Sequence, residues 1–348
     1  MMLLADWQLT GPLLTLWPFR NDVWREHGQP AQRQLIAFAE QLQSHHPLWF
    51  GIHPTQLEAA QRVLPDYIPC LPIAYNDAWA RDIGPLWTQH RGTGRLIAHG
   101  FQFSAWHGLY PDFRDDQLFA EAFAQRCHVS FKYHAMVLEG GAITTDGAGT
   151  AIVHGASILR NNSRWSRPEL THFFAEQLGL QQVFWLDFAH PADETGGHVD
   201  NQIQFLTADT LVLSMPRPDG LYVEHYQAQL ERARSWRNCA GQSYRIIQVP
   251  QPEPIQPVAA EYVSIQPSKD VFPRGVHPLL ASYVNFVRVG DVVVVPTFGI
   301  DSDADALAAL RNAAPELTVI GVAADEFIKA GGALHCMTLH TPDDIVVS

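Results

Sequence analysis

Strand-like and helix-like segments alternate along almost the whole chain, and this alternation restricts the fold more than any other feature. Apolar residues recur at helical spacing over 35–42, which predicts a helix ending before Pro47, and the apolar run 48–52 predicts a buried strand after it. The same patterns predict further helices at 166–179, 224–236 and 302–314, and strands at 183–186, 210–213, 244–249, 281–286 and 317–322. Such alternation is typical of the α/β class.

The charge balance narrows the kinds of partner that the chain can bind. Of its 348 residues, 23 are Lys or Arg and 36 are Asp or Glu, which gives a net charge of −13. Negative charge repels phosphate backbones and anionic lipid, so we expect neither nucleic acid nor a membrane as partner. A small cationic ligand is compatible with this balance.

The sequence also carries signals of compartment. No run of about 18 apolar residues predicts a membrane span, and the N-terminal segment lacks the basic region of a signal peptide. None of the four cysteines lies in a C-x-x-C pair, which favours a reduced protein. We therefore expect a cytoplasmic protein, and a homo-oligomer is compatible with the sequence.

One stretch, 250–278, carries seven prolines and interrupts the alternation. Neither a helix nor a central strand tolerates such a density of proline. The stretch is expected to be a long ordered surface loop, and loops of this length usually serve as lids or linkers.

Two carboxylate motifs lie in the first half of the chain. In 76–85, a charged turn would by default hold an Asp77–Arg81 ion pair, whereas a functional Asp82 would face a pocket and bind a guanidinium in bidentate fashion. Glu139 precedes two glycines, which indicates either tight backbone beside a ligand or a simple turn with a solvated carboxylate.

Two further motifs supply a histidine and a cysteine. His198 and Asp200 would share one face of a strand, which suits acid–base chemistry, a structural hydrogen bond or, less well, part of a metal site. Cys336 follows two glycines and is either a buried small residue or a nucleophile. In extended chain the adjacent His335 would face away from Cys336, so His198 is the preferred partner and His335 is expected to be a packing residue.

Together these residues suggest a cysteine nucleophile among carboxylates. Carboxylates raise the pKa of a thiol, so this combination makes sense when the substrate is itself a cation that stabilises the thiolate. The chain has no G-x-S-x-G elbow and no nucleotide-binding glycine motif, and we expect no cofactor and no metal. Polar positions recur at loosely regular spacing, which is compatible with one functional residue per repeat of a propeller-like fold: Asp82, Glu139, His198, Asn285 and Cys336.

At this point the chain resembles the agmatine deiminase / bacterial-type peptidylarginine deiminase family of guanidine-modifying enzymes. The matching pieces run nearly end to end and are Trp17–Arg20, Asn76–Pro85, Leu138–Gly141, Gly197–Asn201, Ala281–Phe286, Pro296–Gly299 and His335–Cys336. The resemblance implies one catalytic domain over 1–348, with a five-bladed α/β propeller, the pentein fold, and an active site on its axis.

The resemblance also implies roles for individual residues. Cys336 would attack the guanidinium carbon, Asp82 and Asp200 would bind the guanidinium nitrogens, and His198 would protonate the leaving ammonia and then activate water. Glu139 would support His198 or the substrate. Substrate-binding positions would be Trp79, Glu194 and Asn285, with the Glu194 carboxylate facing a primary ammonium at the far end.

The family resemblance leaves the substrate open. Agmatine, giving N-carbamoylputrescine and ammonia in putrescine synthesis, is the first expectation, and free or peptidyl arginine is the alternative. A silent guanidinium- or polyamine-binding protein is a third, and amidine transfer shares the same covalent intermediate. The chain departs from the usual family pattern after the cysteine, where Leu339–His340 replace two glutamines.

Overall fold

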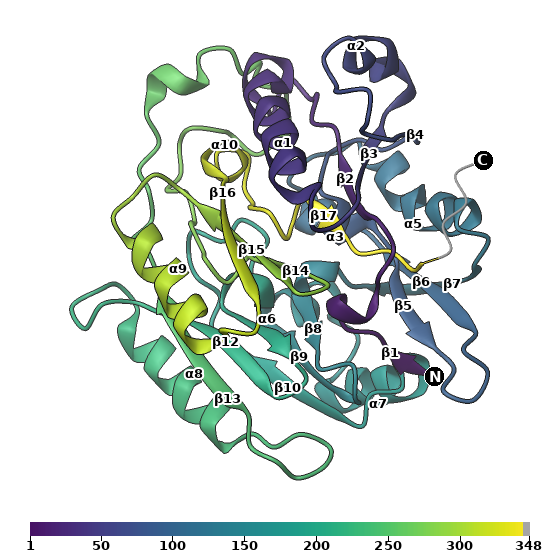
Figure 1. The fold of residues 1–348 in the computed structure, drawn as a ribbon, viewed down its shortest axis with the longest axis vertical. Helices are drawn as coiled ribbons and strands as arrows, with labels where there is room; N and C mark the ends of the chain where they lie inside the picture. Colours follow the sequence, from purple (N-terminus) through teal and green to yellow (C-terminus); the bar gives the residue numbers. More distant parts are fainter. Residues whose placement is uncertain (344–348) are drawn as a thin grey trace.

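The computed structural model describes residues 1–343 and contains five small sheets arranged around a common centre (Figure 1). The prediction of a five-bladed α/β propeller is confirmed. In spatial order, the strands of the five sheets are β1 (Met2–Leu3), β5 (Leu86–Gln89), β6 (Leu96–Gln102) and β7 (Ser130–Val137); β10 (Gln182–Leu186), β9 (Thr150–His154) and β8 (Ile143–Thr145); β11 (Ile203–Thr207), β12 (Thr210–Met215) and β13 (Arg245–Pro250); β14 (Val287–Val289), β15 (Val292–Thr297) and β16 (Thr318–Ala323); β17 (Thr338–Leu339), β2 (Leu13–Leu16), β3 (Leu48–Ile52) and β4 (Cys70–Pro72).

Each sheet contains the same unit of an antiparallel pair followed by a parallel neighbour. In the third sheet, for example, β11 pairs antiparallel with β12, and β12 pairs parallel with β13. Parallel neighbours need a crossover connection, and a helix supplies it in every unit. The helices are α1 (Gln29–Leu42), α2 (Leu57–Gln61), α3 (Ala80–Ile83), α4 (Ala105–Gly108), α5 (Arg114–Arg126), α6 (Gly155–Asn161), α7 (Arg167–Leu178), α8 (Val223–Ser235), α9 (Ser302–Ala313) and α10 (Asp325–Ile328). Figure 1 shows α1, α5, α7, α8 and α9 at the periphery, outside the strands.

Helix α7 illustrates how local sequence sets these elements. Its N-cap, Ser166, accepts a hydrogen bond from the Glu169 backbone N–H, and the Glu169 side chain accepts one from the Ser166 N–H, which completes a capping box. The helix ends where Gly179 adopts a left-handed conformation with φ of 71°. Both boundaries agree with the predicted helix over 166–179.

The ring of sheets closes without a covalent link. The C-terminal strand β17 pairs antiparallel with β2, so residues from both ends of the chain form one sheet. The Thr15 hydroxyl donates to the Met337 carbonyl over 2.9 Å, and a Cβ at Gly11 would lie only 2.0 Å from the Pro342 carbonyl oxygen. Close backbone packing therefore holds the last segment against the first strand.

Two predicted strands are absent from the structure at the positions expected. The run 281–286 is irregular, and β14 begins only at Val287, because the apolar side chains of this run are buried without a ladder partner. His198 is extended, but Val199–Asn201 form a 3₁₀ turn instead of continuing a strand. In both places the sequence pattern predicted burial correctly and the backbone conformation wrongly.

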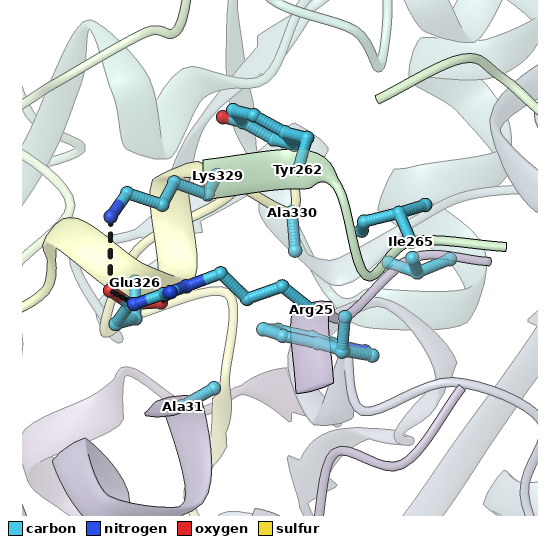
Figure 2. Close-up of a pocket in the computed structure, with 9 residues that line it drawn as sticks. Arg25, Ala31, Tyr262, Ile265, Glu326, Lys329 and Ala330 are labelled. Carbon is cyan, nitrogen blue, oxygen red and sulfur yellow. Dashed lines mark hydrogen bonds and ion pairs between the residues drawn. The ribbon is translucent and has the colours of Figure 1, made fainter. Parts of the chain in front are cut away.

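The proline-rich stretch is the long loop predicted, with one 3₁₀ turn at Ala259–Tyr262. Lys329 ties that turn to α10, since its ammonium lies 2.7 Å from Glu261 and 3.0 Å from Glu326. Figure 2 shows the small pocket under Tyr262, where Arg25 also meets Glu326, with nitrogen–oxygen distances of 2.7 and 2.6 Å. The loop is thus anchored beside the segment that leads to Cys336.

Within residues 1–343, no helix combines the length and apolar character needed to cross a membrane.

Candidate active site

Each of the five regularly spaced polar residues lies just before the first strand of an antiparallel pair. Asp82 precedes β5, Glu139 precedes β8, His198 precedes β11, Asn285 precedes β14 and Cys336 precedes β17. Equivalent positions in five repeated units meet at the same end of the ring. The fold therefore explains why residues far apart in sequence gather in one place.

Gly141 marks the point where three of these side chains converge. A Cβ at this position would lie 2.5 Å from His198 Nδ1, 2.9 Å from Asp200 Oδ2 and 3.0 Å from Asp82 Oδ1. Real Cβ atoms do not approach buried polar atoms so closely, so only glycine fits here. The pair of glycines after Glu139 thus provides the close backbone approach suggested by the sequence.

Asp82 faces this centre and is fixed from both sides. Its Oδ1 accepts the Gly141 backbone N–H over 2.8 Å, and its Oδ2 accepts the Trp106 indole N–H over 2.8 Å. The alternative for this turn, an Asp77–Arg81 ion pair, is not formed. Asp77 accepts the indole N–H groups of Trp24 and Trp79, and Arg81 instead pairs with Asp6.

His198 is fully buried among carboxylates, with Nδ1 3.8 Å from Asp82 Oδ2. Neither ring nitrogen has a hydrogen-bond partner in the described chain, and the same holds for Glu139 Oε2 and Asp200 Oδ1. The other Glu139 oxygen accepts the Asn161 side-chain amide over 3.2 Å. Buried polar atoms are normally paired, so this cluster can accept hydrogen bonds from, and donate them to, a polar ligand.

The Asn285 amide, which the family resemblance assigns to substrate binding, contacts Cys336. Its Nδ2 donates to Cys336 Sγ over 3.2 Å, and its Oδ1 accepts the backbone N–H groups of His335 and Cys336. Asn285 therefore positions the turn that carries Cys336.

The expectation that His335 faces away from Cys336 is wrong, because residues 334–337 form a turn and not extended chain. His335 Nδ1 lies 2.8 Å from Asp200 Oδ2, and Cys336 Sγ lies 3.7 Å from the same oxygen. The two neighbouring side chains thus meet at one carboxylate. His335 is a hydrogen-bonding residue and not only a packing residue.

The electrostatics follow from burial in negative surroundings. Burial, with Asp200 and Asp82 adding to it, raises the pKa of the Cys336 thiol well above its usual value. Burial also raises the pKa of Asp82 and of Glu139. For His198, burial alone would lower the pKa, but the carboxylates around it, first among them Asp82, outweigh burial and raise it. A thiol in this site stays protonated until positive charge arrives.

The far end of the site is closed. Trp79, Glu194 and Arg274 line a cavity at Cys336 of only about 20 Å³, room for about one water. Arg274, from the proline-rich loop, donates to Glu194 over 2.6 Å. Glu194 also lines a neighbouring cavity of about 680 Å³, which is the size of a ligand site.

The sequence patterns missed Trp106, Arg274 and Asp6. Each lies in a segment without a recognisable motif, and only the folded chain brings it to the centre. An arginine inside the proline-rich loop was the one available signal for Arg274. Within residues 1–343, His, Cys, Asp and Glu side chains form no group able to hold a metal ion.

Comparison with known proteins places this geometry in a family. The model of the Porphyromonas-type peptidyl-arginine deiminase family matches residues 2–342. The agmatine deiminase of Ectopseudomonas mendocina is 32% identical, over 97% of this chain and 94% of its own. The agmatine deiminase of Enterococcus faecalis superposes with a TM-score of 0.93 at 25% identity, over 99% of this chain and 96% of that chain. DDAH from Pseudomonas aeruginosa, 14% identical, shares the fold with a TM-score of 0.50 over 95% of this chain and 99% of that chain. This chain belongs to the Porphyromonas-type peptidyl-arginine deiminase family.

Proposed function

We propose that the chain is an agmatine deiminase, which converts agmatine and water to N-carbamoylputrescine and ammonia. The observation that carries this proposal is the set of buried polar atoms without partners around Cys336. Asp200 Oδ1, Glu139 Oε2 and both nitrogens of His198 have no partner in the described chain, Asp200 lies beside the thiol, and the arginines nearby are paired elsewhere. A guanidinium offers planar donors and the positive charge that these carboxylates lack.

In this proposal the substrate activates its own nucleophile. The bound guanidinium offsets the charges of Asp82 and Asp200, so the pKa of the Cys336 thiol falls. The sulfur bonds to the guanidinium carbon, and His198 delivers a proton to the nitrogen that leaves as ammonia. Water activated by His198 then adds to the same carbon, the carbon–sulfur bond breaks, and the ureido product departs as the thiol is restored.

The far end supports agmatine over arginine. Glu194 supplies a carboxylate at the junction of the two cavities, which suits an ammonium, and Trp79 supplies an aromatic wall. Entry requires movement, since the cavity at Cys336 is too small for the substrate. The anchored loop that carries Arg274 is the element beside the opening.

Ammonia release from agmatine, free arginine and a C-terminal arginyl peptide tests the proposal. Agmatine should give ammonia and N-carbamoylputrescine in equal amounts, and Cys336→Ala should abolish both. Cys127→Ala is the matched control, because Cys127 is also buried, but it packs in the core beside Phe123 and Ala124. If only arginine or the peptide is turned over, that compound and not agmatine is the substrate. An active Cys336→Ala enzyme would disprove the mechanism.

Two further outcomes are separable. A silent binder would retain agmatine in calorimetry without releasing ammonia and without alkylation of Cys336 by a haloacetamidine. Amidine transfer would give a new guanidino product when an acceptor amine is added.

We also propose a cytoplasmic location, supported by the four cysteines without disulfides, which cell fractionation tests. One domain over 1–348 is part of the same proposal.

A further inference from the structure

His335 lies between two carboxylates directly behind the nucleophile. Its Nδ1 is 2.8 Å from Asp200 Oδ2, and its Nε2 is 3.0 Å from Asp6 Oδ2. A neutral imidazole has one N–H, and an ionised carboxylate only accepts. Both contacts can be hydrogen bonds only when the three groups share one extra proton, on the imidazole or on a carboxyl group.

This triad, Asp6–His335–Asp200, touches the reactive centre at one atom. Asp200 Oδ2 faces both His335 Nδ1 and Cys336 Sγ, at 2.8 and 3.7 Å. Asp200 Oδ1 has no partner and is free to meet a substrate. The Asp200 oxygen that contacts the thiol is therefore the one that His335 holds, and any proton in the triad acts on Cys336 at short range.

Asp6 is the outer member of the triad, and charged or titratable groups from other elements surround it. Burial alone would raise the pKa of Asp6, but the Arg81 guanidinium and the hydrogen bond with His335 hold it well below its usual value. Arg81 lies 3.1 Å from Asp6 and donates to His340 Nδ1 over 2.7 Å. Burial lowers the pKa of His340 to about 3, so its ring is neutral.

The inner end faces carboxylates, the thiol and His198, whose pKa the surrounding carboxylates, Asp82 first and then Asp200, raise against the effect of burial. Cys336 and Asp200 adjoin His335, and Asp82 lies across the site as a further source of negative charge at the thiol. Because the contact of His335 with Asp200 is the shorter of the two, at 2.8 Å against 3.0 Å to Asp6, we place the shared proton between His335 and Asp200. A cavity of about 40 Å³ lined by Asp6 and His335 has room for water, through which this proton can exchange with solvent.

We propose that Asp6 and His335 are positioning residues that keep one proton stored beside Asp200, so that the carboxylate next to Cys336 is largely neutralised before substrate arrives. The stored proton also fixes Asp200 with Oδ1 toward the substrate. The inference deepens the proposed function, on which it rests for the identity of the substrate. Its effect on the thiol is a property of the free enzyme.

The test is the pH dependence of Cys336 alkylation by iodoacetamide in the free full-length protein. His335→Asn keeps a side-chain donor but cannot store a proton, and Asp6→Asn removes the carboxylate that retains it. Either change should move the alkylation midpoint upward by about one pH unit or more. With agmatine, kcat should fall at least tenfold while KM changes little. The double variant should match the single variants, and Asp6→Glu should restore the midpoint.

Two variants control for general effects. His99→Asn removes a buried imidazole that contacts Thr88 and His134, outside the triad, and Asp22→Asn removes a paired carboxylate near the N-terminus. Neither should move the midpoint. If His335→Asn does not fold, the alkylation midpoints of Asp6→Asn and Asp6→Glu are sufficient to test the triad.

The outcomes separate this inference from the proposed function. Unchanged midpoints in folded Asp6→Asn and His335→Asn overturn the triad, and so do additive shifts in the double variant. If the variants show the predicted shifts but the parent releases no ammonia from agmatine, the triad is supported and the proposed function is overturned.

Discussion

At the residue scale, Gly141 leaves no room for a side chain at the meeting point of His198, Asp200 and Asp82. Gly141→Ala should reduce kcat by roughly a hundredfold or more, because displacing reacting groups by about 1 Å has that cost. Folding should be retained, since the added methyl group displaces side chains and not a strand. Steady-state kinetics and thermal melting measure the two effects. Gly92→Ala, at an exposed turn, is the control, and unchanged kcat in Gly141→Ala would contradict the site geometry.

Glu194 governs binding and not chemistry in the proposed mechanism. Glu194→Gln should raise KM for agmatine by about 10- to 100-fold, because a charge-assisted hydrogen bond contributes about 1.5–3 kcal/mol, and kcat should change little. An alkylguanidine without the amine serves as the control substrate. With that compound the two enzymes should have similar KM values. An equal rise for both substrates would mean that Glu194 acts only through Arg274.

At the element scale, Asp116 in the first turn of α5 makes stability depend on pH. Its carboxylate accepts the backbone N–H groups of Asn76 and Asp77 and the Tyr110 hydroxyl, and burial raises its pKa to about 7. An unfolded aspartate titrates near 3.9, so the folded state binds this proton more tightly. The associated stability is complete below about pH 4 and is lost as pH rises through about 7.

Asp116→Asn should remove this loss, which amounts to at most about 4 kcal/mol between pH 4 and 8. The amide keeps the acceptor for both backbone groups and carries no charge. Urea unfolding at pH 5 and pH 8 measures the difference, with exposed Asp66→Asn as the control. Equal pH dependence in the parent and Asp116→Asn would contradict the buried, protonated state of this group.

The elements also show how far sequence patterns reach. Helix α7 was predictable because Ser166, Glu169 and Gly179 specify its ends locally. The irregular run 281–286 was not, since burial of an apolar run is compatible with several backbone conformations. Motifs indicated the reactive set around Cys336, whereas the contact between His335 and Asp6 joins residues 329 positions apart and has no local signature.

At the scale of the whole molecule, we propose that the five sheets unfold as one domain closed by β17. Removing residues after Met337 deletes β17, its pairing with β2 and the Trp87 indole hydrogen bond to the His340 carbonyl. This truncation should abolish the cooperative transition or lower its midpoint strongly. Removing residues after Asp343 spares these contacts and is the control. Calorimetry checks both, and a parent with two separate transitions would contradict a single domain.

The noncovalent closure at β17 and β2 has a consequence for how the chain can be connected. The last blade is completed by hydrogen bonds and packing, not by a peptide bond. The chain ends could therefore lie at another point of the ring without changing the fold. Circular permutants that join the present ends by a flexible linker and open the chain at the exposed turn 238–242 would keep every blade intact. In such a permutant, Cys336 would lie in the interior of the new chain and still complete the proposed catalytic centre.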